Sequence, residues 1–484
     1  MPIKETVKQI ATLVKNEIKA AVGYLQTFEE LLENHDVQRA IGMLESHSST
    51  ATNNLLQYNS DTHKIMSKPH KPIFDKNGNY LRDKPVNRIA IPYHKFINEV
   101  ALVFIYGRPV KWSNATTDSS DQTDDKFNRL VSTLVNARFD AHIREAKRHA
   151  GCEGCSAMLF HTYQEDGEAK LLIRVLAKSK NDDIYTLFDQ YGRLSVFAWG
   201  YTTLNADKHS VHHYDIYTKD TIYFCSTEKS GTWQVDKQAN RVGKIPVIVF
   251  QQEVEWEGVQ SMIDRIEDAY SKNADTNDNF GDPALVATSD IVNTLPKQEE
   301  ESRLYVLKNG GDIRYLERTN TNEARQKEID ALDEQIMTKS FTPNLTLEQL
   351  RGLANASGET LRQVMLLAEI KADKRKESHD GYLSRISSLM KAIMGRVLDV
   401  RSGGYDDIVV THEFQEPFGS DVARVLNDAV KMYGAGAMSL QTLLEQSYLV
   451  PNADKEMERI NKENEEAAKL QQQTALVDVF GTAR

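Results

Sequence analysis

The stretch EWEGVQSMIDRIEDAYSKN (residues 255–273) decides the fold, because its apolar residues recur at helical spacing. Two runs of β-type composition follow it, PALVATSDIV (283–292) and RLYVLKNGGDIRYL (303–316). The glycine pair Gly310–Gly311 predicts a turn within the second run. A helix therefore leads into a small extended insert.

Helical spacing resumes after the insert at Ile329, Leu332 and Ile336. It stops near Pro343, because a proline ring cannot continue a helix through its own amide. A third helix is predicted over about 359–396. Two helices that frame a small β insert, followed by a loop and a long helix, suit a lever or a pore wall better than a substrate pocket.

Length and composition bound the protein class. At 484 residues the chain is too long for one ordinary core, and two to four domains are expected. Hydrophobic residues make up 40% and charged residues 27%, which is ordinary for a soluble globular protein. There is no run of about 18 apolar residues, so no membrane span is expected. Residues 1–18 alternate charged and apolar positions at helical spacing, which predicts an amphipathic helix and not a secretory signal.

The net charge of −11 is the wrong sign for a protein that grips nucleic acid through its phosphates. This charge argues against a conventional DNA-binding domain. It remains compatible with a protein past which DNA must slide, where weak contact is an advantage.

Before residue 255 the pattern changes several times. Residues 68–88, rich in Lys, Pro and Asn, predict a loop, and residues 113–125 have the composition of a flexible loop. Residues 125–150 predict one amphipathic helix. Residues 157–250 read as short strands joined by tight turns, the signature of one meandering antiparallel sheet that closes with KIPVIVF. A helix before this region is predicted to present one apolar face, made of Phe96, Ile97, Val100, Val103 and Phe104.

After residue 401 a strand is predicted at 407–414. Two helices follow at 421–437 and 439–450, and the charged segment 452–473 predicts an exposed helix.

No residue pattern predicts a metal or cofactor site. Cys152 and Cys155 form a lone CxxC, whereas a zinc site requires a second pair or histidines at ligand spacing. Small residues between a helix and a strand are the favoured interpretation, and metal binding by this pair stays open. His212 and His213 are adjacent in a strand, where alternation places them on opposite faces.

No catalytic residue is predicted either. Asp264, Glu267 and Asp268 share one predicted helix and could suggest a metal-dependent nuclease or phosphatase. They have no His or Lys partner at a suitable spacing, so solvated helix charge is the favoured interpretation. Two alternatives to a pore remain open: this type of enzyme, and a helical adaptor that forms no ring.

Three collinear stretches carry a family resemblance: NRIAIPYHKFINEVALVFIYGRP (87–109), GKIPVIVF (243–250), and the loop and helix at 343–376. They resemble the portal proteins of tailed bacteriophages, specifically the SPP1-type portal family. The positions that match the family's motifs are Asn87, Tyr93, Tyr106, Gly107, Arg108, Pro109, Pro343, Asn344, Glu348, Gly352, Ser357, Gly358, Leu361, Glu369 and Lys371.

The resemblance implies an α+β portal-type subunit with a strand-rich wing, a helical stem, a small β-containing clip and an α-helical crown. The implied segments are the wing at 1–254, a stem helix at 255–282, the clip at 283–318, a second stem helix at 319–341, a tunnel loop at 342–358, a long wing helix with a return strand at 359–416, and crown helices with a tail at 417–484.

The implied function is that of a head-to-tail connector without enzymatic activity or cofactor. Such subunits form a ring, twelve in assembled virions, at one capsid vertex, and DNA is packaged and ejected through the ring's channel. The implied partners are double-stranded DNA without sequence specificity, the terminase, head-completion proteins, and capsid and scaffold proteins. The implied location is the virion, and the host cytoplasm during assembly.

The residues expected to face DNA lie in the implied tunnel loop: Asn344, Thr346, Gln349, Arg351, Asn355 and Ser357. Gly352 and Gly358 would let this loop flex. Four cations could lie on the stem wall: Lys272, Arg325, Lys327 and Lys339. The alternative for the loop is an ordinary helix–helix connection, and for each cation a solvated helix face.

Overall fold

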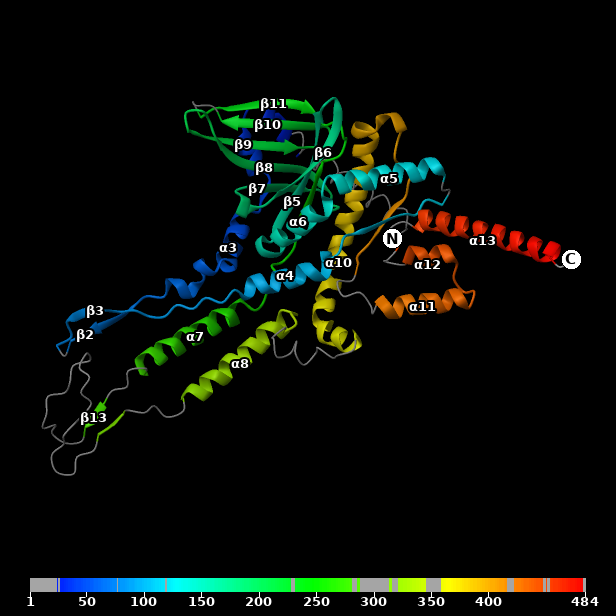
Figure 1. Ribbon diagram of the computed structural model, residues 1–484. Coiled ribbons are helices and arrows are strands. Elements are labelled where there is room, and N and C mark those ends of the chain that lie inside the picture. Colours follow the sequence, from blue (N-terminus) through cyan, green and yellow to red (C-terminus); the bar gives the residue numbers. More distant parts are fainter. Residues whose placement is uncertain are drawn as a thin grey trace, which may run out of the picture. The chain divides into compact units, whose positions relative to one another are not determined.

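The computed structural model describes residues 24, 27–75, 77–117, 120–227, 231–280, 285–287, 313–315, 321–344, 358–415, 422–446, 450 and 453–481 (Figure 1). The chain divides into two compact units. The first contains residues 1–351 and 364–415, and the second contains 352–363 and 416–484. The α+β content matches the fold class expected from the sequence.

The first unit is built around two antiparallel sheets (Figure 1). The three-stranded sheet has the order β12-β5-β6, with β12 Val247–Gln251, β5 Cys155–Glu165 and β6 Glu168–Leu176. The six-stranded sheet has the order β1-β7-β8-β9-β10-β11, with β1 Glu45–Ser46, β7 Asp183–Phe188, β8 Leu194–Leu204, β9 Ser210–Tyr217, β10 Thr221–Thr227 and β11 Trp233–Ala239.

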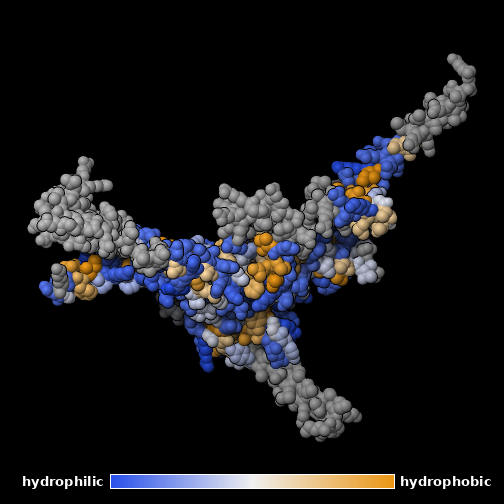
Figure 2. All heavy atoms as spheres, turned by 90° about the horizontal axis from the view of Figure 1, so that it is seen from below, coloured by the Kyte–Doolittle hydropathy of each residue, from blue (hydrophilic) through white to orange (hydrophobic). Residues whose placement is uncertain are grey.

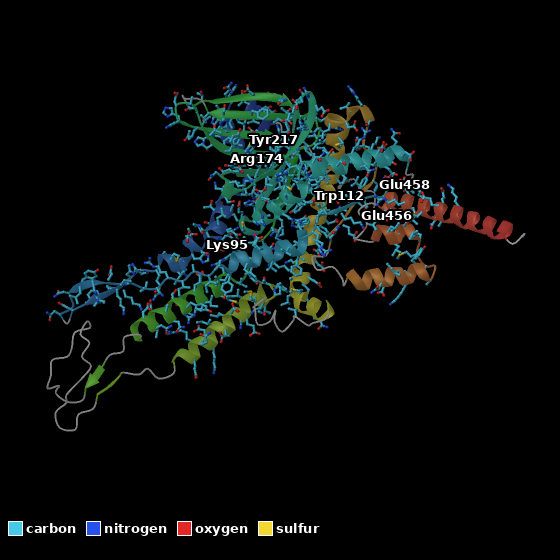
Figure 3. The ribbon with its side chains drawn as sticks, in the orientation of Figure 1. Lys95, Trp112, Arg174, Tyr217, Glu456 and Glu458 are labelled. Carbon is cyan, nitrogen blue, oxygen red and sulfur yellow. The ribbon has the colours of Figure 1, made fainter. Side chains whose placement is uncertain are left out.

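The prediction of a single meandering sheet is therefore wrong, although its strands are where the alternation placed them. The last strand, β12, pairs with β5 (Val249 opposite Ala157) instead of adding to β11. Short turns such as Asp166–Gly167, both at positive φ, close the hairpins as expected. One core lies between the sheets and includes Trp199 and Tyr217. At its edge the exposed Arg174 of β6 places its guanidinium 4.3 Å from the Trp199 ring centre, near Tyr217 of β9 (Figure 3).

Helices cover the three-stranded sheet in the largest core. They are α4 (Tyr93–Tyr106), α5 (Asp121–Asn136), α6 (Phe139–Glu153) and α10 (Gly358–Ile393), the last continued by a π-helical turn at Met394–Leu398. The single helix predicted over 125–150 is two helices. They break at Arg138, which has a φ of +53° that a right-handed helix cannot contain.

The predicted apolar face of α4 is only partly correct. Ile97 and Phe104 are buried, whereas Phe96 and Val103 are exposed. The segment predicted as a flexible loop at 113–125 begins in a strand, since β4 (Lys111–Asn114) pairs with β15 (Val410–Glu413), and it ends inside α5. Ser120 then caps α5 by accepting a hydrogen bond from the Thr123 amide.

The N-terminal part of the first unit packs on the six-stranded sheet. Phe28 and Leu32 are fully buried in a core with Ile216 and Tyr223 of that sheet. The helices α2 (Val37–Gly42) and α3 (Ser48–Tyr58) follow, then short 3-10 turns at Ser60–Thr62 and Lys64–Ser67. The predicted helix at residues 1–18 lies outside the described residues.

Residues 68–88, predicted as a loop, contain a β-hairpin. Its strands are β2 (Lys71–Phe74) and β3 (Tyr80–Lys84), which pair antiparallel, and most of the hairpin is exposed. Asp75 forms the turn by accepting the amide hydrogens of Asn77 and Asn79. Composition alone hid these strands, because Lys, Pro and Asn are all depleted in sheets.

The helix, insert and helix order that decided the fold is confirmed. Helix α7 spans Gln260–Phe280 and α8 spans Thr321–Lys339, with a short antiparallel pair of β13 (Leu285–Ala287) and β14 (Ile313–Tyr315) between them. Helix α7 begins four residues later than Trp256, where the apolar spacing began, because Gly258 has a φ of +84°. The predicted turn at Gly310–Gly311 lies outside the described residues.

The second unit contains α11 (Val422–Gly434), α12 (Leu440–Gln446) and α13 (Ala453–Gly481), which agree with the three predicted helices. Helix α12 contacts both α11 and α13. Among the described residues, no helix combines the length and apolar character of a membrane span.

Candidate channel-wall helices and the joint that holds them

Helices α7 and α8 lie side by side and run in opposite directions (Figure 1). Their shared core includes Ile263, Ile266 and Ile329, which are all buried. Arg265 bridges the pair at its surface, with its guanidinium 2.7 Å from the Glu328 carboxylate. Tyr93 of α4 donates a 2.5 Å hydrogen bond to Asp333 of α8, which ties the pair to the body of the unit.

Two of the three acidic residues singled out on α7, Glu267 and Asp268, are engaged with the segment that precedes α4. Glu267 has a side chain only 1% exposed, with His63 Nδ1 at 2.6 Å and the Ile91 amide donating at 2.8 Å. Asp268 pairs with Lys68 at 2.8 Å. The interpretation of Glu267 as solvated charge is therefore wrong. Its partners come from about 200 residues upstream, a separation at which sequence spacing carries no signal.

Two of the four cations expected on the stem wall connect α7 with itself or with α8. Lys272 pairs with Asp268 at 2.6 Å, one helical turn earlier. Arg325 of α8 donates to the Lys272 carbonyl and to the Thr276 hydroxyl of α7. Lys327 is exposed. Lys339, also exposed, is the last residue of α8.

A buried ionic joint stands where α7 begins and α8 ends. At its centre is Glu255, whose side chain is 0% exposed, as is that of its partner Lys147 from α6. Helix α10 supplies Lys371 Nζ at 3.1 Å and Arg375 Nε at 3.5 Å from the Glu255 carboxylate. Gln252 donates a further hydrogen bond of 2.7 Å. One carboxylate thus faces three cations in the interior.

The same α10 cations hold backbone from both helices of the pair. Lys371 Nζ donates to the Glu255 carbonyl, just before α7, and to the Ser340 carbonyl, just after α8. Arg375 donates to the Glu253 carbonyl. A displacement of this part of α10 therefore acts on both helices at once, because the start of α7 and the end of α8 lie at the same end of the antiparallel pair.

Electrostatics make Glu255 indispensable to the joint. Burial alone would raise the pKa of Glu255, but the cations Lys147, Lys371 and Arg375 outweigh burial and lower it far below its usual range. Burial lowers the pKa values of Lys147 and Lys371, which the Glu255 charge opposes. Burial likewise lowers the pKa of His379, one turn further along α10. Without the carboxylate the site would be a desolvated cluster of like charges.

A family model described as "Phage portal protein, SPP1 Gp6-like" matches residues 38–470. The chain belongs to this family. Membership gives it the role of a portal, or head-to-tail connector, and makes it a component of a phage particle. The family is structural and not enzymatic. No curated protein matches the chain.

Two solved structures are similar in fold. One, described as the neck of an empty GTA particle computed with C6 symmetry, has a TM-score of 0.42 and 10% identity over 72% of this chain and 88% of that chain. The other, the neck of a native GTA particle computed with C12 symmetry, has a TM-score of 0.39 and 12% identity over 74% of this chain and 88% of that chain.

Residues that carry the portal resemblance lie at junctions between segments. Asn87 donates to Asp275 and Asp278 of α7. The Tyr106 hydroxyl is 2.8 Å from His379 Nδ1 of α10. Gly107 ends α4 where a Cβ would lie 2.3 Å from the Val103 carbonyl oxygen. Sequence reasoning matched these positions without giving them a role, and the structure shows them joining α4, α7 and α10.

Most of the expected tunnel loop of this portal lies outside the described residues, namely Thr346, Gln349, Arg351, Gly352, Asn355 and Ser357. Asn344 is described and half-buried, one residue beyond Pro343. Gly358 is the first residue of α10. The DNA-facing and hinge roles of these residues stay predictions.

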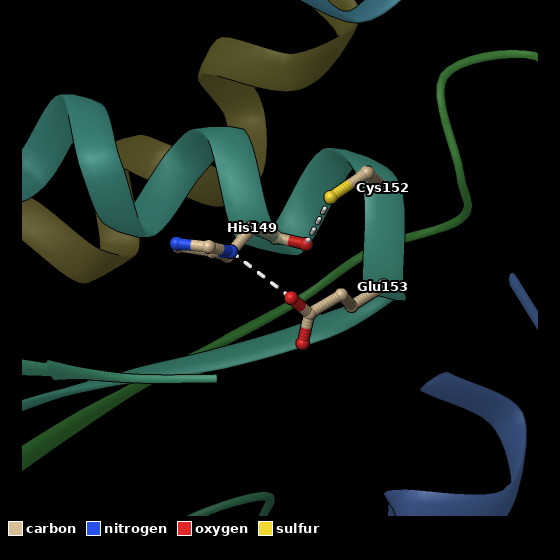
Figure 4. Close-up of side chains that lie close together, drawn as sticks. All are labelled: His149, Cys152 and Glu153. Carbon is tan, nitrogen blue, oxygen red and sulfur yellow. Dashed lines mark hydrogen bonds and ion pairs between the residues drawn. The ribbon is translucent and has the colours of Figure 1, made fainter. Parts of the chain in front are cut away.

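The remaining ligand-type cluster is His149, Cys152 and Glu153, whose candidate donor atoms lie within 4.8 Å of one another (Figure 4). Glu153 accepts the Lys178 amide at 2.6 Å and the Ser179 hydroxyl at 2.5 Å, and its contact with His149 is 2.9 Å. Burial raises the pKa of the Cys152 thiol, which disfavours the thiolate that a metal would bind. These contacts anchor the turn after β6.

The two cysteines do not share a site. Cys152 packs in the core that includes α7 and α8, whereas Cys155 packs between the two sheets. Both are buried as free thiols. They sit where helix α6 ends at Gly154 and strand β5 begins, which confirms the favoured interpretation of small residues between a helix and a strand.

Proposed function

We propose that twelve copies of this chain close into a ring at one capsid vertex, and that double-stranded DNA passes through its centre during packaging and ejection. Membership of the portal family supports this proposal. The observation that carries the mechanical part is the attachment of α10, through Lys371, to the start of α7 and to the end of α8.

The α7–α8 pair is proposed as the channel wall, or stem. Its shared apolar core and its Arg265–Glu328 bridge make it a stiff two-helix element. The β13–β14 pair that connects the two helices is proposed as part of the clip at 283–318. The remaining proposed segments are the wing (1–254), the tunnel loop (342–358), the long wing helix with its return strand (359–416) and the crown (417–484).

The net negative charge of the subunit suits a channel through which DNA passes. Each phosphate contact adds to the free energy that retains DNA, so a channel must contact DNA weakly. A subunit of net charge −11 repels the backbone, within the roughly 8–10 Å that screening allows. The polar residues proposed for the tunnel loop, Asn344, Thr346, Gln349, Arg351, Asn355 and Ser357, would touch DNA without reading its sequence. Gly352 and Gly358 would be its hinges.

The joint is proposed to couple this loop to the channel wall. The loop precedes α10 in sequence, and α10 carries Lys371 and Arg375. A force on the loop would reach the start of α7 and the end of α8 through these two side chains. The proposed partners are the terminase and head-completion proteins at the clip, and capsid and scaffold proteins at the wing. The proposed location is the capsid portal vertex, after assembly in the host cytoplasm.

A packaging reaction tests this function. Heads assembled with the wild-type chain should protect DNA from nuclease when terminase and ATP are supplied, and heads assembled without the chain should not. A Lys371→Met chain, which loses both backbone contacts, should form heads but package less DNA. Equal protection with and without the chain would refute the proposed function.

A further inference from the structure

The β2–β3 hairpin is an arm with little support of its own. Among the described residues β2 and β3 pair only with each other, and a lone two-stranded hairpin is marginally stable in water. Nevertheless the arm exposes three large apolar or aromatic side chains: Phe74 at 56%, Tyr80 at 59% and Leu81 at 60%. The Phe74 and Tyr80 rings pack edge to face at 6.4 Å. In the space-filling view, hydrophobic surface marks the end of this arm at the left edge (Figure 2).

The base of the arm is fixed to α7. Lys71 Nζ lies 3.6 Å from the Asp275 carboxylate, and on the return side the Asn87 amide donates to Asp275 at 2.7 Å. Helix α8 packs on another flank of α7 (Figure 1). The arm, α7 and α8 therefore follow one another across the unit, with the arm at one side and α8 at the other.

The two sides carry opposite charge. The arm, residues 71–84, contains four Lys and Arg against two Asp, a net charge of +2. The α8 segment 321–339 contains five Asp and Glu against three Lys and Arg, a net charge of −2. Arg82 and Lys84 of the arm are exposed, as are Asp330 and Glu334 of α8. Helix α8 also leaves the small residue Ala331 exposed beside these carboxylates, where an aromatic ring could approach.

We propose that the arm of one copy docks on the outward face of α8 in the next copy. A ring requires two different surfaces on each subunit that complement each other, because every contact is head-to-tail. A basic, apolar arm at one side and an acidic helix face at the other meet that requirement. The inference rests on the proposed ring and identifies one of its subunit contacts.

Charge reversal tests the contact on the full-length chain. Arg82→Glu combined with Lys84→Glu should raise by about tenfold the protein concentration at which rings dissociate, which corresponds to about 1.4 kcal/mol. Asp330→Lys combined with Glu334→Lys should have a similar effect. Joining all four substitutions should bring the dissociation concentration back towards the wild-type value, because opposite charges face each other again.

The matched control reverses two cations on turns of the six-stranded sheet, Lys208→Glu with Lys219→Glu. It changes net charge by the same amount and should leave ring dissociation unchanged. Arm variants that dissociate like this control, or a four-substitution chain that recovers nothing, would overturn the contact while leaving the ring intact. Arm variants with normal rings but weakened DNA retention would assign the arm to DNA instead. A wild-type chain that forms no ring would refute the proposed function and this contact together.

Discussion

Replacing Glu255 by Gln is the most informative perturbation of the joint. The change keeps the shape of the side chain but removes the negative charge that faces Lys147, Lys371 and Arg375. Removing one partner of a buried ion pair costs about 3–5 kcal/mol, because the remaining charge is left without compensation. Lys371 and Arg375 keep some exposure and can turn towards water, whereas Lys147 is fully buried. The expected loss is therefore near the lower end, about 3 kcal/mol.

The loss of stability should be measured around the joint itself, because a chain of two units need not unfold in one step. Hydrogen exchange of α6 and of the middle of α10, around Lys371 and Arg375, reports the free energy of opening around the joint. A loss of about 3 kcal/mol speeds exchange there by more than about a hundredfold. Urea unfolding followed by tryptophan fluorescence adds a second measure, because buried Trp256 adjoins Glu255 in the chain.

Two further variants sharpen the test. Glu99→Gln removes the carboxylate of a half-exposed pair with Arg148, so it should cost less than about 1 kcal/mol. Lys147→Met in the Glu255→Gln background removes the fully buried cation and should recover part of the loss. If Glu255→Gln and Glu99→Gln destabilise the protein equally, the charge balance of the joint is not what holds α10 to the helix pair.

Three other outcomes follow from single residues. Burial lowers the pKa of His94 from 6.5 to about 4, so between these pH values the unfolded chain binds a proton that the folded chain does not. The free energy of unfolding should therefore fall by up to about 3 kcal/mol as the pH drops from about 6.5 to 4. In His94→Gln the free energy of unfolding should depend less on pH over this range. Gly243→Ala should lower the unfolding temperature more than Gly167→Ala. Both glycines have positive φ, but a Cβ at residue 243 would lie 1.9 Å from Arg396 Nη1, whereas a Cβ at residue 167 would meet nothing within 4 Å. Equal losses of unfolding temperature would contradict this steric clash. Gly358→Pro should fold normally, because proline is tolerated at the start of a helix, but impair packaging or ring closure; normal packaging would remove the hinge role.

Periodicity predicted the element order well, because helix and strand patterns are local. The α7–insert–α8 order was predicted from spacing alone, and so were the strands of both sheets apart from β1. The ends of the helices and strands, and the break between α5 and α6, were not predicted. Arg138 adopts a left-handed conformation that no glycine or proline signals, and the strands at 71–84 are hidden by a loop-like composition.

The joint could not be predicted, because its members are far apart in sequence. Lys147 and Glu255 are 108 residues apart, and Lys371 is a further 116 away. The spacing of Lys371 and Arg375 at i,i+4 showed that two cations share one face of a helix, but not that a buried carboxylate lies opposite. Similarly, nothing near Glu267 indicated that His63 would be its partner.

Imaging the purified chain, together with its native mass, tests the central claim most directly. We predict a closed ring of twelve 54.9-kDa copies, about 660 kDa, with a central channel lined by α7 and α8. A closed ring that carries the α7–α8 pair on its outer rim, or a chain that stays a monomer or dimer even in the presence of its capsid and scaffold proteins, would contradict it.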